Sequence, residues 1–358
     1  MSEFLIASLA FFCTVLALAL LERLASRLRL LDYPNGHKTH SSPTPVVGGI
    51  GVVAILFGFG IIFEAPAGAA WLYGGIAGAT LLGLIDDLRP LGAKTKLILM
   101  LGIFALTLRE SGTLLVSLGE LLPGTTVQLG SLALPFTLFA AVGVINAFNL
   151  IDGMDGLAGS VGLCVLSGHL LVANLIGATE WVPLLAVVIA ATAAFLCFNL
   201  RVPGRSRARM FLGDAGSLAL GFVMLWIAVD LTQRPSGAPP MVMVWLLALP
   251  MLDTVATMLL RIREGKSIFA PGHDHFHHLL RTHGASVERI VCTATVLSIG
   301  SATTGVLMWQ AGVPDWVSLA AFLLVTAAYV RLHLRAWSKL GRGRRNAGAM
   351  ELHPEQIA

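Results

Sequence analysis

Amide and carboxylate side chains recur at every third position between residues 146 and 155, inside an otherwise apolar stretch: Asn146, Asn149, Asp152 and Asp155. On a helix, a spacing of three keeps side chains close together, and Gly153 and Gly156 favour a break in the helix after them. Helix caps and interhelical hydrogen bonds are the structural alternative. Polar groups at membrane depth more often line a bundle interior or a substrate path, so we predict that this stretch forms part of a functional site.

A second group of carboxylates, Asp86 and Asp87, closes an apolar run and is followed by the cations Arg89, Lys94 and Lys96. Adjacent carboxylates repel each other unless cations or a metal ion offset their charge. We interpret the pair as part of the same site, and a solvated loop with ordinary surface charges is the alternative.

A third acidic position, Asp214, lies between Gly213 and Gly216 where another apolar run begins. The glycines would let the backbone approach a bound group closely, and Ser217 could cap the helix. Asp214 suits a hard cation better than a phosphate because it is itself negative, and a plain N-cap is the alternative. Four preceding arginines could bind phosphate or could only mark the membrane topology: Arg201, Arg205, Arg207 and Arg209.

Four histidines stand within six residues of a further polar segment: His273, His275, His277 and His278. No cysteine or glutamate stands at the spacing of a usual zinc site, so a phosphate-binding and acid–base cluster is favoured. A pH-sensitive surface loop is the alternative. Asp253, inside an apolar run, is either a further site carboxylate or a helix-packing partner, and both interpretations stay open.

Carboxylates without cysteine select a hard, oxygen-loving ion, Mg²⁺ or Mn²⁺, which usually arrives with phosphates. Phosphoryl transfer needs such a metal ion together with fixed cations, and little covalent chemistry from the protein. If the four groups meet beside the membrane, one lipid substrate and one water-soluble substrate are expected.

The elements that would position these groups are membrane helices. Of the 358 residues, 56% are hydrophobic and 12% are charged, whereas soluble domains carry about 25% charged residues. The predicted fold is therefore an all-α polytopic membrane protein, with a single membrane domain over 1–340 and a basic, polar cytoplasmic tail over 341–358. Eleven spans are predicted, at about 3–24, 46–64, 67–85, 95–110, 132–150, 157–178, 180–200, 215–231, 241–260, 290–310 and 315–336. Four cysteines stand singly in apolar runs and are predicted to be buried, reduced and structural: Cys13, Cys164, Cys197 and Cys292.

Positive charge supports this topology. With the N-terminus outside, 22 of the 24 Lys and Arg residues, Lys38 among them, fall in the loops and the tail of the inner side, and only Arg109 and Arg234 fall on the other side. Positive charge marks the cytoplasmic face, which then also carries every polar motif described above. The segment 111–131, centred on Pro123 and Gly124, is predicted to form a small hairpin on the outer side.

In this order, the motifs resemble those of the polyprenyl-phosphate N-acetylhexosamine-1-phosphate transferases (glycosyltransferase family 4). The matching elements are Asp86-Asp87, Asn146-x-x-Asn-x-x-Asp-Gly-x-Asp-Gly-Leu157, Phe211-Leu-Gly-Asp-x-Gly-Ser217 and His275-x-His-His278. The resemblance implies transfer of a sugar 1-phosphate from a UDP-N-acetylhexosamine to undecaprenyl phosphate, with release of UMP. It implies a multi-pass enzyme of the bacterial cytoplasmic (inner) membrane, at the first membrane step of cell-surface polysaccharide synthesis, such as that of the lipopolysaccharide O-antigen.

Residue roles follow from the resemblance. It implies Asn149 and Asp214 as magnesium ligands, with Mn²⁺ as a substitute, and Asp86 and Asp87 at the lipid phosphate. The other catalytic and substrate-binding residues it implies are Asp152, Asp155, His275, His277, His278, Asn146, Lys94, Gly153, Met154 and Arg209. A phosphate monoester has a second pKa of about 6, so the aspartate pair is expected to orient the acceptor more than to deprotonate it. Direct attack by the lipid phosphate is favoured over a covalent aspartate intermediate.

Several alternatives are kept. The histidine pattern resembles the UDP-N-acetylglucosamine branch more than the phospho-N-acetylmuramoyl-pentapeptide transferases, which typically carry three adjacent histidines. A transporter or flippase of an anionic lipid-linked substrate would need polar groups through the membrane depth. A CDP-alcohol phosphotransferase would need an arginine that the segment 155–160 lacks. Besides the two substrates and the bilayer, no nucleic-acid partner is expected; homodimerisation and the sugar are left open.

Overall fold

A computed structural model describes residues 2–33, 43–61, 68–268 and 272–350 of the chain. Nearly all ordered segments are helices, which confirms the all-α prediction. The principal helices are α1 (Glu3–Leu24), α2 (Gly48–Gly60), α3 (Ala69–Leu88), α4 (Ala93–Ser111), α5 (Ala133–Ile151), α6 (Leu157–Ile176), α7 (Val182–Asn199), α8 (Gly213–Thr232), α9 (Pro240–Leu246), α10 (Ala248–Arg263), α11 (Phe276–Thr282), α12 (Val287–Gln310) and α13 (Asp315–Met350). The remaining elements are two 3₁₀ turns, η1 (Gly130–Leu132) and η2 (Thr179–Trp181), and an antiparallel pair of two-residue strands, β1 (Leu31–Asp32) and β2 (Thr44–Pro45).

The protein is a polytopic membrane protein. Within the described residues, eight helices are long and apolar enough to cross a bilayer, and a ninth span is present if the bent pair α9–α10 counts as one. The axes of α9 and α10 meet at 74°. The other two predicted spans correspond to α2, which has only 13 residues, and to α4, which carries Lys94, Lys96 and Arg109. The count of eleven therefore stays a prediction.

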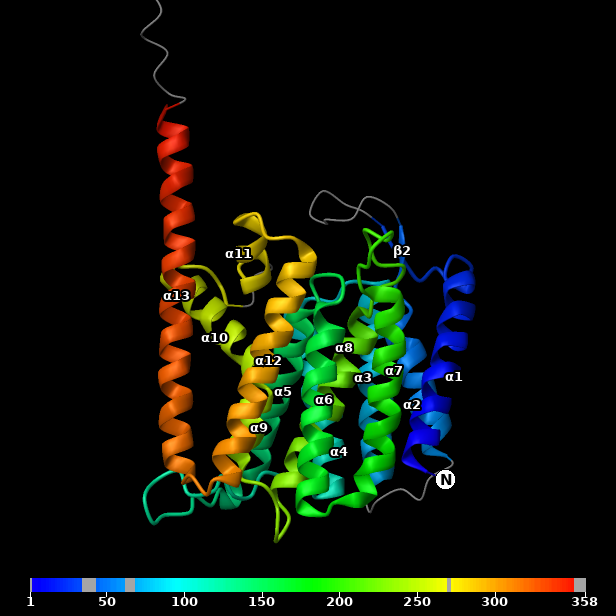
Figure 1. Cartoon of the computed structure of the whole chain (residues 1–358), viewed down its shortest axis with the longest axis vertical. Coiled ribbons are helices and arrows are strands. Elements are labelled where there is room, and N and C mark those ends of the chain that lie inside the picture. Colours follow the sequence, from blue (N-terminus) through cyan, green and yellow to red (C-terminus); the bar gives the residue numbers. More distant parts are fainter. Residues whose placement is uncertain (1, 34–42, 62–67, 269–271, 351–358) are drawn as a thin grey trace, which may run out of the picture.

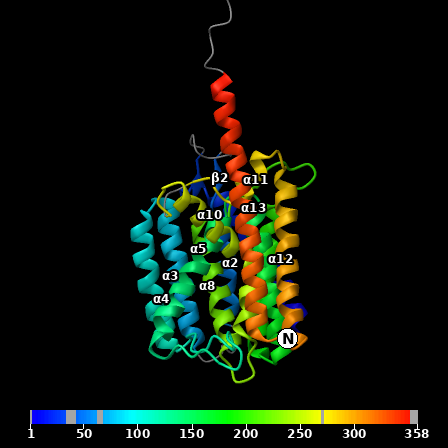
Figure 2. The ribbon, with the colours of Figure 1, turned by 90° about the vertical axis from the view of Figure 1, so that its left-hand side faces the viewer.

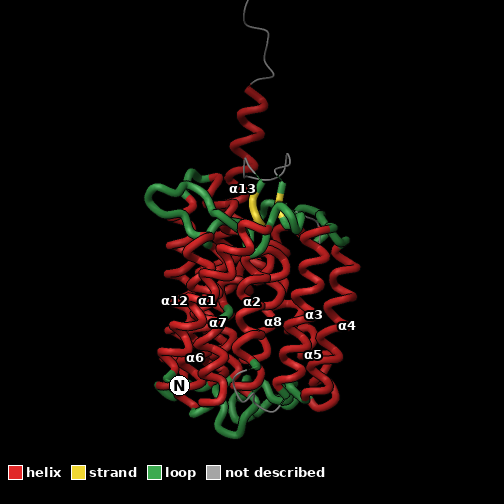
Figure 3. The backbone as a smooth tube through the Cα atoms, turned by 90° about the vertical axis from the view of Figure 1, so that its right-hand side faces the viewer, coloured by secondary structure: helices red, strands yellow, loops and turns green. Residues whose placement is uncertain are grey.

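The helices run side by side, and their connections gather at the two ends of the bundle (Figures 1 and 3). The N-terminus lies at one end, and the β1–β2 pair and α11 lie at the other. Helix α13 lies at the edge of the bundle and extends beyond it on the side of α11 (Figure 2). Its helical backbone continues into the range 341–358 that was expected to form a tail. Lys38 lies outside the described residues.

Helix α8 forms the centre of the bundle. Its residues are apolar on every side and almost all buried, as expected for a helix enclosed by other helices. It packs against α2, α3 and α5. The closest approach needs glycine, because a Cβ atom on Gly49 of α2 would lie 2.1 Å from the Cα atom of Gly216. The start of α8 is therefore held firmly among its neighbours.

The opposite end of the bundle contains the predicted hairpin. Leu118 donates to Val127 O and Leu129 donates to Val116 O, both through backbone N–H groups, around a turn in which Thr125 N–H donates to Leu122 O. The hairpin predicted for 111–131 is therefore confirmed, whereas its location on the outer side of the membrane stays a prediction. The four cysteines are free, but Cys13, Cys197 and Cys292 have exposed side chains. The expectation that all four are buried was wrong, because Cys13, Cys197 and Cys292 lie on helix faces that the described part of the bundle leaves exposed.

Candidate active site

Lys96, in the first turn of α4, lies at the centre of the candidate site. Its Nζ atom is 2.8 Å from Asp86 Oδ2 and 2.5 Å from Asp214 Oδ2, and it donates to Asn149 Oδ1 at 3.3 Å. The Asn149 amide donates in turn to Asp214 Oδ1 and to Ser217 Oγ, both at 2.8 Å. Side chains from α3, α4, α5 and α8 therefore meet at one point, although the sequence separates them by up to 131 positions, from Asp86 to Ser217.

Asp87 supports this cluster by capping α8 from the neighbouring helix. Its two carboxylate oxygens accept hydrogen bonds from the backbone N–H groups of Asp214 at 2.9 Å and Ala215 at 3.1 Å. The N-cap residue of α8, Leu212, provides no side-chain acceptor, so these N–H groups would otherwise lack a partner. A Cβ atom on Gly83 of α3 would lie 2.3 Å from the Asp214 backbone, and glycine at 83 therefore permits this contact between α3 and α8.

Asp152 follows the last residue of α5 and is half-buried. Its pKa is raised well above the usual value, because burial disfavours the charged carboxylate and because Asp214, Asp87 and Asp155 place further negative charge around it. The site therefore concentrates more negative charge than Lys96 alone offsets. A divalent cation brought to this point would favour the ionised form of Asp152.

Asp155 connects the Asn146–Asp155 stretch to the loop between α7 and α8. Its Oδ2 atom accepts hydrogen bonds from Arg201 Nε at 2.8 Å and from the Ala208 backbone N–H at 3.1 Å. Gly156 N–H donates to Asn199 Oδ1 at 2.7 Å, so α7 also supports the turn. These bonds fix the segment that contains Asp152 and Gly153.

The histidine segment, residues 273–278, comes later in the chain but lies in the same region of the structure. His277, in α11, is buried, with 1% of its surface exposed, and a Cβ atom on Gly153 would lie 2.7 Å from its Nε2 atom. The ring of His277 lies parallel to that of His275, with centroids 5.8 Å apart, and 4.2 Å from the centroid of His278. His273 Nδ1 is 3.3 Å from His278 Nε2. The four histidines therefore form one cluster beside the Asn146–Asp155 stretch.

The imidazoles of His277 and His278 are outside the membrane spans. Burial and the neighbouring imidazoles lower the pKa of His277 to about 3 and that of His278 to about 4. Both rings are therefore neutral at pH 7. Neutral rings can each offer one donor and one acceptor.

Other residues singled out from the sequence are exposed or have partners other than those expected. Lys94 is exposed, and the amide of Asn146 donates to a backbone carbonyl one turn earlier in α5. Arg209 forms two hydrogen bonds with the carboxylate of Glu22 in α1, at 3.0 and 2.6 Å. Met154 is half-buried against the apolar core. Ser217, expected as a cap, instead accepts the hydrogen bond from Asn149.

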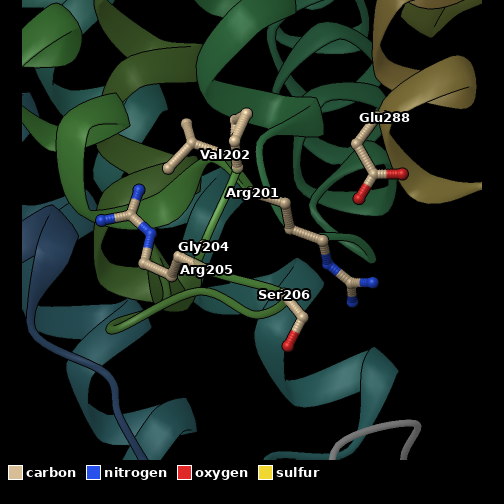
Figure 4. A pocket seen from close by; sticks show the side chains of 7 residues that line it. Arg201, Val202, Gly204, Arg205, Ser206 and Glu288 are labelled. Atoms are coloured by element: carbon tan, nitrogen blue, oxygen red, sulfur yellow. The ribbon is translucent and has the colours of Figure 1, made fainter.

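The arginine-rich loop between α7 and α8 borders a pocket of about 440 Å³ together with the first turn of α12. Arg201 and Glu288 extend from different walls of this pocket, whereas Arg205 points away from them (Figure 4). The Arg205 guanidinium donates to the backbone carbonyls of Cys197 and Leu200. Since Arg201 also holds Asp155, this pocket adjoins the outer edge of the site.

Sequence reasoning did not include Lys96 or Asp253 in its list of site residues. The signal for Lys96 was present, since a lysine two residues after Lys94 stands beside the same aspartate pair. Which of the two lysines faces the cluster depends on how α4 is rotated against α3 and α5. Within the described residues, no group of three or more His, Cys, Asp or Glu side chains is arranged to hold a metal ion; the predicted magnesium pair, Asn149 and Asp214, needs fewer protein ligands.

Comparison with known proteins identifies the class of this bundle and its site. The sequence profile of glycosyl transferase family 4 matches residues 69–232, which include the aspartate pair, Asn149 and Asp214. The chain belongs to this family, and the matched region contains three of the four polar motifs.

Individual relatives extend over almost the whole chain. The undecaprenyl-phosphate alpha-N-acetylglucosaminyl 1-phosphate transferase of Escherichia coli (strain K12) is 34% identical over 332 residues, which cover 91% of this chain and 90% of that protein. The protein of the same name from Yersinia pestis is 32% identical over 88% of this chain and 87% of its own length. A probable undecaprenyl-phosphate N-acetylglucosaminyl 1-phosphate transferase of Bacillus subtilis (strain 168) is 30% identical over the same shares as the E. coli protein.

Proposed function

We propose that this protein transfers N-acetylglucosamine 1-phosphate from UDP-N-acetylglucosamine to undecaprenyl phosphate and releases UMP. The observation that carries the proposal is the convergence of the four motifs at one end of the helix bundle. Contacts around Lys96 join three of the motifs, and His277 lies against Gly153 of the Asn146–Asp155 stretch. The names of the relatives support N-acetylglucosamine as the sugar and undecaprenyl phosphate as the acceptor.

Magnesium is the cofactor that we propose, and the donor set fits it. Oxygen atoms of Asp86, Asp214 and Asn149 already surround one cationic group, the Lys96 ammonium. Mg²⁺ prefers oxygen ligands and usually takes one or two carboxylates, completing its shell with water and substrate phosphates. Asn149 and Asp214, which are hydrogen-bonded to each other, would hold the ion. When bound, the ion would neutralise charge on the diphosphate of the donor.

The protein's own side chains would then position the two phosphates for direct displacement. An oxygen of the lipid phosphate attacks the β-phosphorus of the donor, the bond from that phosphorus to its bridging oxygen breaks, and UMP leaves. All four carboxylate oxygens of Asp86 and Asp87 already accept hydrogen bonds, from Lys96, Leu91, Asp214 and Ala215. This bonding favours an orienting role for the aspartate pair. Lys96 supplies a fixed positive charge beside the transferred phosphoryl group.

We further propose that the protein resides in the bacterial cytoplasmic (inner) membrane, with its N-terminus outside and its active site facing the cytoplasm. The charge distribution of the loops supports this orientation. In this orientation the start of the glycan is assembled where UDP-sugars are found. In a cysteine-free variant, Ser206→Cys should react with a membrane-impermeant thiol reagent only after the cells are opened. Labelling in intact cells would contradict the orientation without affecting the proposed reaction.

Purified protein incubated with Mg²⁺ and undecaprenyl phosphate tests the reaction directly. UMP release and a radiolabelled lipid product are expected with UDP-N-acetylglucosamine, and less of both with UDP-N-acetylgalactosamine or UDP-N-acetylmuramoyl-pentapeptide. Replacement of Mg²⁺ with excess chelator should stop the reaction, and Mn²⁺ should restore it. A protein that releases no UMP from any of the three donors would refute the proposal.

A further inference from the structure

Asp253 is a carboxylate inside the bent α9–α10 pair, and only 2% of its surface is exposed. Its three hydrogen-bond partners within the described residues come from two other segments. Asp253 Oδ2 lies 2.7 Å from His275 Nδ1, and Asp253 Oδ1 accepts the Phe276 backbone N–H at 2.8 Å and the Tyr329 hydroxyl at 3.2 Å. A buried carboxylate is tolerated when its oxygens are satisfied in this way. Asp253 therefore joins α10 to the start of α11 and to α13.

These bonds determine the chemical form of His275. A carboxylate can only accept, so the proton of a neutral His275 lies on Nδ1, and Nε2 is left as an acceptor. The Phe276 N–H is one of the first in α11 and has no acceptor within that helix. Asp253 therefore fixes both the ring of His275 and the point at which α11 begins.

The position of His277 depends in turn on that of His275. His277 follows His275 by two residues, and their rings are parallel to within 8°. Among the residues that the structure describes, neither ring nitrogen of His277 has a hydrogen-bond partner, although both are buried, and its Nε2 atom faces Gly153. A buried imidazole with two unpaired nitrogens, facing the site, is placed to receive a substrate group. Its position depends on where α11 begins.

Helix α13 holds the segment from the outer side. Tyr329, His333 and Trp337 follow one another at intervals of four residues, so they share one face of α13. The ring of Tyr329 stacks on that of His333, and Trp337 Nε1 donates to the backbone carbonyl of Asp274 at 3.0 Å. The Tyr329 hydroxyl completes the shell of Asp253. The terminal helix thus contacts the histidine segment both directly and through Asp253.

We infer that Asp253 is a positioning residue of the active site: it holds His275 in its Nδ1–H form and fixes the start of α11, so that His277 faces the Asn146–Asp155 stretch. Tyr329 supports Asp253 in this role. The inference rests on the proposed transferase function for its activity readout. Its structural readout, the tautomer of His275, is independent of that function.

The test compares Asp253→Asn with a matched control, Asp230→Asn. Asp230 is also a polar residue within the bundle, where it accepts from Trp181 Nε1 at 2.6 Å and from Arg234 Nε at 2.8 Å, but it belongs to the C-terminal end of α8, far from Asp214. Loss of a partner that orients a site residue typically reduces activity about 10- to 100-fold. Asp253→Asn is expected to lower kcat/KM for UMP release by this factor, whereas Asp230→Asn should stay within about twofold of the unmodified protein.

A double-mutant comparison separates positioning from a general effect on folding. If Asp253 acts through His275, Asp253→Asn should cause no further loss in a His275→Gln background, because coupled residues are not additive. An equal loss in both backgrounds would overturn the inference. Should Asp253→Asn fail to fold, Tyr329→Phe replaces it, with an expected loss of about tenfold for one hydrogen bond to a carboxylate. A loss that is absent in the His275→Gln background supports the inference, and no loss overturns it.

The ¹⁵N NMR signals of the histidine rings provide the readout that does not depend on catalysis. In the full-length protein, the His275 signals, identified by their disappearance in His275→Gln, should report the Nδ1–H tautomer. In Asp253→Asn they should shift toward Nε2–H. An unchanged tautomer would contradict the positioning role. If the unmodified protein shows this tautomer but releases no UMP, the proposed function fails while the Asp253–His275 contact stands.

Discussion

Replacement of Lys96 by methionine tests whether the cation at the centre of the cluster is essential. Methionine keeps most of the length and the apolar stem of lysine but removes the ammonium that contacts Asp86, Asp214 and Asn149. Breaking a fully buried ion pair costs about 3–5 kcal/mol. Here 13% of the Lys96 side chain, 12% of Asp86 and 30% of Asp214 are exposed, so water reduces the cost, and we expect about 2–3 kcal/mol.

If this free energy is lost from the stabilisation of the transition state, kcat/KM falls by about 30- to 150-fold. Initial rates of UMP release at saturating Mg²⁺ measure the fall in kcat/KM, and thermal unfolding tests whether the variant is folded. The matched control is Lys94→Met, two residues away on the same helix, where the side chain is exposed; its rate should stay within about threefold. Near-normal activity of Lys96→Met, or an equal loss in Lys94→Met, would refute the central position of Lys96.

Three further predictions concern the metal ligand, the contact between motifs and the histidines. Asp214→Ala should abolish turnover while the protein still folds, and near-normal UMP release would remove Asp214 from the metal site. Gly153→Ala should reduce kcat/KM at least about tenfold, because the added Cβ atom meets His277 Nε2 at 2.7 Å. The control is Gly143→Ala on α5, where no described atom beyond the adjoining helix backbone lies within 4 Å of the Cβ position, and equal activities would contradict the contact. Because the pKa values of His277 and His278 fall from 6.5 to about 3 and about 4 in the folded protein, the unfolded chain binds more protons in this range. Stability should therefore decrease as the pH is lowered from 6.5 toward 4, less steeply in His277→Asn; unchanged melting temperatures over this range would contradict the burial of the rings.

The sequence alone was enough to predict that the motifs belong to one site, because a chain that crosses a membrane restricts where polar residues can lie. A polar side chain is costly in hydrocarbon, so Asp86, Asn149 and Asp214 stand out at the ends of apolar runs. The alternation of spans and the distribution of positive charge then assign all these ends to one side. The hairpin at 111–131 was equally visible, because Pro123 and Gly124 favour a turn.

Other features depended on side-chain direction, which the sequence pattern does not specify. Asp87 is adjacent to Asp86, yet one caps α8 while the other contacts Lys96. Arg209 was grouped with the phosphate-binding residues, but in the folded chain it pairs with Glu22 of α1. Neither partner could be identified without knowing which helices are neighbours and how each is rotated.

Composition, span length and charge in the sequence of this protein determined the membrane class and the polar motifs, because polar groups are costly in hydrocarbon. The resemblance of those motifs to a known family then implied the residue roles. The tertiary structure alone decided that Lys96 rather than Lys94 enters the cluster, that Asp253 binds His275, and that His277 meets Gly153. Those contacts join residues up to 124 positions apart, and they arise from the packing and rotation of whole helices. Local sequence does not encode that geometry, because a helix with the same pattern can face its neighbours at many angles.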